Sequence, residues 1–157
     1  ADVAALDRDG AALAETAATL WVGTLSQGLL AIDAASGTPR PIPRGAPQDR
    51  VRALLAEREG GLWIVSGSSL LRLAHDVVTT WSEGELHDPF VHALHETDGA
   101  TLWIGTSSAG TIELRHGSPF VVRGRDEGLE GTLVFAIHAR AAGGFWVTST
   151  GGLMVYE

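Results

Sequence analysis

The chain has 157 residues, of which 45% are apolar, so it can bury a sizeable core and is not a disordered chain. Eleven basic and 19 acidic residues give a net charge of −8. This charge argues against nucleic acid or an anionic membrane as the main partner, because both attract positively charged protein surfaces. The apolar runs have the length of strands and fall short of the ~18 residues of a membrane span, so no membrane insertion is expected. Cysteine is absent, which excludes disulfides and thiol chemistry.

A tryptophan-centred motif of the form Leu-Trp-Ile-Gly-Thr occurs four times along the chain. Its tryptophans are Trp21, Trp63, Trp103 and Trp146, spaced by 42, 40 and 43 residues. This period is typical of the four-stranded blades of a β-propeller. Because indole rings suit the space between packed sheets, we expect these tryptophans to be structural and to lie between blades rather than to form a ligand-stacking row.

A second motif, Val-x-Ala-Leu or a close variant, precedes the tryptophans and predicts strand one of each blade. It occupies residues 51–54, 91–94 and 134–137, always beginning 12 residues before the tryptophan. In the first repeat the motif is found at residues 3–6, 18 residues before Trp21. We therefore expect an expanded hairpin over residues 7–19.

The remaining strands follow in the same order in each repeat. Third strands are predicted at residues 29–32, 70–73, 111–114 and 153–156, and fourth strands at 41–42, 77–81 and 119–122. No helix is predicted, because no stretch maintains an apolar period of 3.6 residues.

These elements predict an all-β fold of about four four-stranded antiparallel propeller blades, at residues 1–45, 46–84, 85–127 and 128–157. The last blade lacks its fourth strand. The chain also begins directly at a predicted strand one, without an initial Met. We therefore expect a segment of a larger propeller or one half of an oligomeric one, although closure of four blades by themselves is an alternative.

In the order and type of its motifs, the chain resembles the two-component regulator propeller repeat. The resemblance covers nearly the whole chain and is strongest at residues 91–114. It implies a periplasmic or other extracytoplasmic ligand-sensing region of a bacterial hybrid histidine kinase or diguanylate cyclase, with carbohydrates as ligands in some relatives. It implies no catalytic residue, because the repeated motif is structural.

One position varies between blades in a way that favours a binding site. The second residue of strand one is Ala4, Arg52, His92 and Phe135 in successive repeats, and the preceding loops contain Asp49, Asp88 and Glu130. Different side chains at one equivalent position would build an asymmetric site on the loop face. We therefore predict a ligand-binding rim for a small molecule or glycan, made of Asp49, Arg52, Asp88, His92, Glu130 and Phe135. Ordinary solvated loop residues are the alternative interpretation.

The histidines near residue 90 do not predict a metal site. His92 and His95 are three residues apart in a strand, so they point to opposite faces and cannot share one zinc ion. His95 recurs as His138 in the next repeat, which favours a structural role. No cofactor or metal is expected, and no catalytic residue is assigned.

Two other functions remain open from the sequence. One is a metal-dependent lyase or hydrolase with its site at the channel mouth, as in lyases of the virginiamycin B type, which have a comparable blade repeat. The other is an assembly scaffold, natural or engineered, that binds a protein partner or a second copy through open blade faces.

Overall fold

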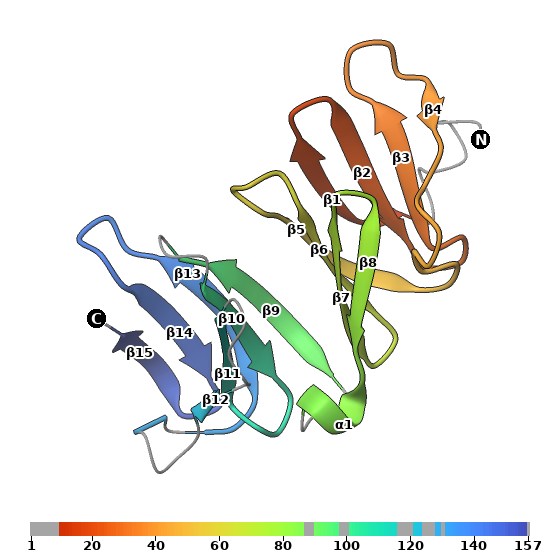
Figure 1. Cartoon of the computed structure of the whole chain (residues 1–157). Helices are drawn as coiled ribbons and strands as arrows, with labels where there is room; N and C mark the ends of the chain where they lie inside the picture. The colour runs from red at the N-terminus through yellow and green to blue at the C-terminus, as the bar shows by residue number, and fades with distance from the viewer. Residues whose placement is uncertain are drawn as a thin grey trace. The chain divides into compact units, whose positions relative to one another are not determined.

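The computed structural model describes residues 10–86, 90–97, 101–115, 121–123, 128–129 and 131–156. Within these residues the chain forms antiparallel sheets with a single turn of helix (Figure 1). The prediction of an all-β fold built from blade-like sheets is confirmed. The sheets belong to two compact units, one ending at Trp81 and the other beginning at Ser82.

The first unit contains two four-stranded sheets, each with its strands in sequential order. The first sheet consists of β1 (Gly10–Thr16), β2 (Thr19–Thr24), β3 (Leu29–Asp33) and β4 (Pro39–Arg40). The second sheet consists of β5 (Val51–Ala56), β6 (Leu62–Ser66), β7 (Ser69–Ala74) and β8 (Val77–Trp81).

The second unit contains the helix and two further sheets. Helix α1 (Glu83–Leu86) precedes the third sheet, which consists of β9 (Val91–Glu96), β10 (Thr101–Thr106), β11 (Thr111–Arg115) and β12 (Val121–Arg123). The fourth sheet has three strands, β13 (Val134–Ala139), β14 (Phe145–Ser149) and β15 (Gly152–Tyr156).

The first repeat differs from the prediction. The strand that pairs with β2 is β1, with Ala14 opposite Trp21, as Leu55 is opposite Trp63 in the second sheet. The predicted expanded hairpin over residues 7–19 is therefore wrong, since a two-residue turn joins Thr16 to Thr19. Gly10 occupies the place of the motif's valine, and the turn has no glycine, so the usual markers of strand and turn are missing. Residues 3–6 lie outside the described residues.

The fourth strand of the first sheet is displaced from its predicted position, and one helical turn was not predicted. Strand β4 is Pro39–Arg40 rather than residues 41–42, and it is an edge strand, where proline is tolerated. Helix α1 is too short to produce an apolar period. Its sequence signal is a capping box, in which the Ser82 amide donates to Glu85 Oε2 at 2.7 Å and the Ser82 hydroxyl at 2.9 Å. These hydrogen bonds hold the pKa of Glu85 below its usual value.

A close approach between neighbouring sheets explains why the two sequence motifs occur together. A Cβ atom on Gly23 would lie 2.5 Å from Cγ1 of Val51, and one on Gly105 would lie 2.6 Å from Cγ1 of Val134. The glycine of the tryptophan motif thus makes room for the valine that begins strand one of the next sheet. At these two places, one in each unit, the glycine and the valine are matched in size.

Trp21 and Trp103 lie between the two sheets of their own units. Trp21 packs against the core of the first unit, whose buried residues are Leu29, Ala46, Val51, Leu62, Ile64, Leu71 and Leu73. Trp103 packs against the core of the second unit, formed by Leu129, Val134, Phe145 and Val147. Trp63 is buried beside Trp81, with 5.6 Å between ring centroids, whereas Trp146 is 38% exposed.

Candidate functional site

The position predicted to vary between blades is a β-bulge in all four sheets. The residue that has no partner in the register is Arg52 in β5, His92 in β9 and Phe135 in β13. In the first sheet the bulge is at Ala11, so Ala11 rather than Ala4 is the structural equivalent, and Ala4 lies outside the described residues. A bulge turns its side chain away from the regular alternation of the strand.

In the first unit, two of the predicted rim residues lie at the same end of the second sheet. Arg52 is half-buried and donates from Nη2 to the carbonyl of Gly67 in the β6–β7 turn. Asp49 accepts a hydrogen bond of 3.4 Å from the hydroxyl of Ser66, the last residue of β6. These hydrogen bonds connect Asp49, which precedes β5, to the end of β6, and Arg52, which lies within β5, to the β6–β7 turn.

In the second unit, β9 and β13 lie side by side and present two bulge residues with different chemistry. The His92 side chain is exposed, and Phe135 is 55% exposed. Asp88 and Glu130, the acidic members of the predicted rim in this unit, lie outside the described residues. The binding role of all six rim residues stays a prediction.

The histidines occupy equivalent positions opposite tryptophans. His95 is the register partner of Trp103, and His138 is the partner of Trp146. The His95 ring is 6.1 Å from that of Phe145. Among the described residues, no group of three histidine, aspartate or glutamate side chains could hold a metal ion.

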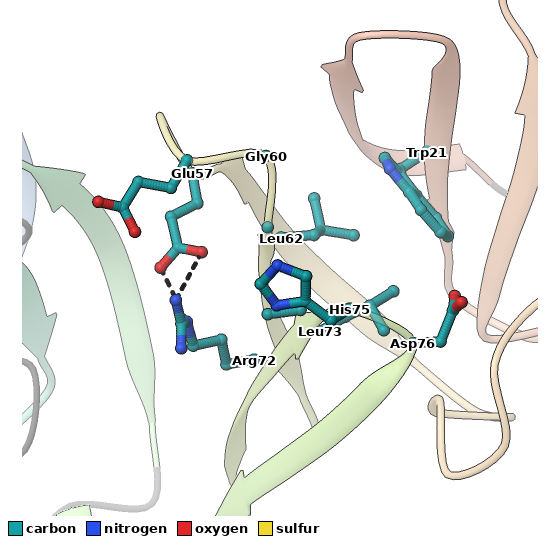
Figure 2. A pocket seen from close by; sticks show the side chains of 11 residues that line it. Trp21, Glu57, Gly60, Leu62, Arg72, Leu73, His75 and Asp76 are labelled. Atoms are coloured by element: carbon teal, nitrogen blue, oxygen red, sulfur yellow. Dashed lines mark hydrogen bonds and ion pairs between the residues drawn. The ribbon is translucent and has the colours of Figure 1, made fainter.

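A pocket of about 430 Å³ lies at the other end of the sheets in the first unit, away from Asp49 and Arg52 (Figure 2). Trp21 of the first sheet forms one wall, and the β5–β6 and β7–β8 hairpins form the other. Its charged or titratable lining residues are Glu57, Glu59, Arg72, His75 and Asp76, and its apolar ones include Trp21, Leu62, Leu73 and Ala74.

A partly buried ion pair joins the β5–β6 turn, which contains Glu57, to Arg72 of strand β7. Arg72 donates from Nε to Glu57 Oε1 at 2.8 Å and from Nη2 to Oε2 at 2.9 Å, a bidentate arrangement. The Glu57 side chain is only 2% exposed. Gly61 is required beside it, because a Cβ there would lie 2.0 Å from Glu57 Oε2. The Arg72 guanidinium also lies 5.7 Å from the centre of the Trp63 ring.

The β7–β8 turn presents two polar side chains to the pocket. His75 and Asp76 both have positive φ, 50° and 61°, as a two-residue turn of type I′ requires. Histidine and aspartate adopt this conformation more readily than most residues other than glycine. The turn is therefore compatible with the sequence and holds both residues at the pocket.

The sequence analysis did not predict this pocket. Residues 57–61 have the composition of a turn, and Arg72 looks like a polar residue on an otherwise apolar strand. The available signal was the pairing of Arg72 with Trp63 in neighbouring strands, since a charged residue opposite a buried tryptophan needs a partner of opposite charge.

Comparison with known proteins gives structural matches only. No protein-family model and no curated protein sequence matches the chain. Two extracellular domains of proteins assigned as hybrid two-component systems from B. thetaiotaomicron are similar in structure, with TM-scores of 0.71 and 0.65, at 16% and 17% identity over 95% and 87% of this chain. Virginiamycin B lyase from Staphylococcus aureus is also similar, with a TM-score of 0.73 at 10% identity over 96% of this chain.

The chain spans only part of each of these proteins, namely 24% and 18% of the two extracellular domains and 56% of the lyase. At these identities the likeness concerns the fold alone. No helix within the described residues is long and apolar enough to cross a membrane. The four sheets therefore have a propeller-type fold, which occurs both in extracellular domains of two-component systems and in virginiamycin B lyase.

Proposed function

We propose that this chain is a non-catalytic ligand-sensing or ligand-binding propeller module from the extracytoplasmic region of a bacterial signal-transduction protein. The observation that carries the proposal is the structural match, over 95% of the chain, to an extracellular domain assigned to a hybrid two-component system. The motif order of the two-component regulator propeller repeat supports the same assignment and the periplasmic location.

The bulges support a binding role for the end of the sheets where they lie. The repeat places an extra residue at one equivalent position in every sheet, and that residue is arginine, histidine or phenylalanine in the last three. A packing role alone would favour the same residue in each repeat, as at Val51 and Val134, which fill equivalent places. Small molecules and glycans are the ligand classes we propose for this rim.

A glycan array probed with the labelled chain tests this proposal. We expect binding to a subset of oligosaccharides and its loss in a variant carrying Arg52→Ala, His92→Ala and Phe135→Ala. His92→Ala alone should leave the fold intact, because the side chain is exposed. Equal binding by the triple variant would contradict the assignment of the rim.

The alternative is a metal-dependent lyase, which is favoured by the similarity to virginiamycin B lyase. A catalytically inactive form of that enzyme is known in complex with quinupristin, which supplies a probe. If the chain is a binding module, quinupristin remains intact after incubation with the chain and a divalent metal. Breakdown that stops on addition of a chelator would establish the lyase instead.

We also propose that the chain associates with a second copy of itself through the fourth sheet. Trp146, Leu153 and Val155 share one face of this sheet and are 38%, 64% and 40% exposed. The equivalent faces around Trp21 and Trp103 are covered by a neighbouring sheet of the same unit. Light scattering over a concentration series tests this: a dimer supports the proposal, and a monomer at every concentration contradicts it.

A further inference from the structure

Two of the residues that line the pocket beside Trp21 are leucines. At the equivalent positions of the repeat, the second unit has aromatic residues. Leu62 and Phe145 each immediately precede the tryptophan of their own sheet. Each is also paired in the strand register with a residue of the next strand of its sheet: Leu62 in β6 is opposite Leu73 in β7, and Phe145 in β14 is opposite Tyr156 in β15. The two pairs are therefore equivalent positions of the repeat.

In the second unit this space is filled. The Phe145 ring centroid lies 4.6 Å from that of Trp103, and the Tyr156 centroid lies 6.0 Å from it. Phe145 and Tyr156 stack at 5.1 Å with an angle of 8° between their planes. Three aromatic side chains thus form one continuous cluster between the sheets.

In the first unit, Leu62 and Leu73 line the pocket opposite Trp21, as Figure 2 shows. Leucine side chains are smaller and not planar, so space remains next to the indole. The resulting volume of about 430 Å³ falls within the ~300–1,000 Å³ range of small-molecule sites. The indole itself is held in place, because Trp21 Nε1 donates to the Thr16 hydroxyl at 3.0 Å.

The charged residues that line the pocket indicate which ligand charge it favours. Glu57, Glu59 and Asp76 contribute three carboxylates, whereas Arg72 contributes the one guanidinium and is bound to Glu57. The lining therefore favours a positive charge. A tryptophan face adds to this preference, since indole is the aromatic group that binds cations best.

We propose that this pocket binds a small aromatic amine, with its ring beside Trp21 in the space that Phe145 and Tyr156 fill in the second unit, and its ammonium group at the Asp76 carboxylate, which Figure 2 shows on the same side of the pocket as Trp21. The site is separate from Arg52, the bulge residue of its own unit, because it lies at the opposite end of the second sheet. Its test does not depend on the proposed function of the rim.

Titration with phenethylamine, followed by NMR of the Trp21 indole N–H, tests the proposal in the full chain. We expect saturable shifts of this signal, which the variant Trp21→Phe identifies. Two matched compounds of similar size, 2-phenylethanol and 3-phenylpropionate, should bind about tenfold more weakly or not at all, because they lack the positive charge.

Two variants of the pocket separate its shape from its charge. Leu62→Phe with Leu73→Tyr introduces the pair that the second unit already carries, and it should abolish the shifts while the chain stays folded by circular dichroism. Glu59→Gln with Asp76→Asn keeps the shape and should weaken phenethylamine binding about tenfold without affecting 2-phenylethanol. Asparagine at position 76 tolerates the positive φ of that turn.

Three results would overturn the proposal: no saturable shift with phenethylamine, equal binding of the neutral alcohol, or undiminished binding by the filled pocket. If the filled variant fails to fold, the charge variant still decides the question. Leu25→Ala, at an exposed residue that follows β2 and lies outside the pocket lining, serves as the control and should leave phenethylamine binding unchanged.

Discussion

The two units are built from the same repeat, yet they fill the space beside their inter-sheet tryptophan differently. In the second unit Trp103 contacts a stacked pair of aromatic rings, Phe145 and Tyr156. In the first unit Trp21 faces leucines and a pocket. The repeat thus determines where the tryptophan lies, whereas two neighbouring side chains determine whether the space beside it is a closed core or an open pocket.

Truncation of the two tryptophans should give the largest difference between the units. Trp103→Ala should lower the free energy of unfolding by about 3–5 kcal/mol, since it leaves a cavity inside an aromatic cluster. Trp21→Ala should cost less, roughly 2–3 kcal/mol, because the space beside it is already open. Urea unfolding measures both values, and equal losses would contradict the difference in packing.

The tryptophans were predictable from the sequence, but the difference between them was not. The period of the repeat is a local pattern, and it gave the sheets and most strand positions. The pocket depends on Leu62 and Leu73 relative to Phe145 and Tyr156, and these become comparable only once the strand register aligns the pairs. The first strand was missed for a related reason, because Gly10 replaces the valine that marks it elsewhere.

The candidate rim shows a similar division between what sequence and structure reveal. Comparison of the repeats found Arg52, His92 and Phe135 as one varying position. It could not show that the position is a bulge, because a bulge is a mismatch in length between two paired strands. The pocket residues Glu57, His75 and Asp76 come from hairpin loops that differ between repeats, so no repeated pattern indicates them.

The Glu57–Arg72 ion pair is a second feature that distinguishes the first unit. Arg72→Met should cost roughly 2–4 kcal/mol, because it leaves the buried Glu57 carboxylate without its bidentate partner. Replacement of both residues, Glu57→Gln with Arg72→Met, should recover at least half of this loss. A double-mutant cycle by urea unfolding measures the coupling, and additive losses would show that the pair contributes nothing specific.

Substitution of the glycines of the tryptophan motif tests a feature in which the two units should behave alike. Gly23→Ala and Gly105→Ala each place a Cβ about 2.5 Å from a valine side chain, so each should cost about 1–3 kcal/mol through overpacking. Val51→Ala should relieve the first substitution and Val134→Ala the second. Thermal unfolding of the four variants and the two combinations measures this, and a cost in only one unit would show that the close approach is not shared.

Truncation of Trp146 should have the smallest effect on the stability of the single chain. Its ring is 38% exposed and lies 5.3 Å from the Arg140 guanidinium, so Trp146→Ala should cost roughly 1 kcal/mol or less in dilute solution. The same substitution should weaken self-association, because Trp146, Leu153 and Val155 form the face that we propose a second copy covers. Urea unfolding at low concentration and light scattering at high concentration separate the two effects. A large loss of stability in the monomer would mean that Trp146 is a core residue like Trp103, and it would remove the distinction between covered and open faces on which the proposed association rests.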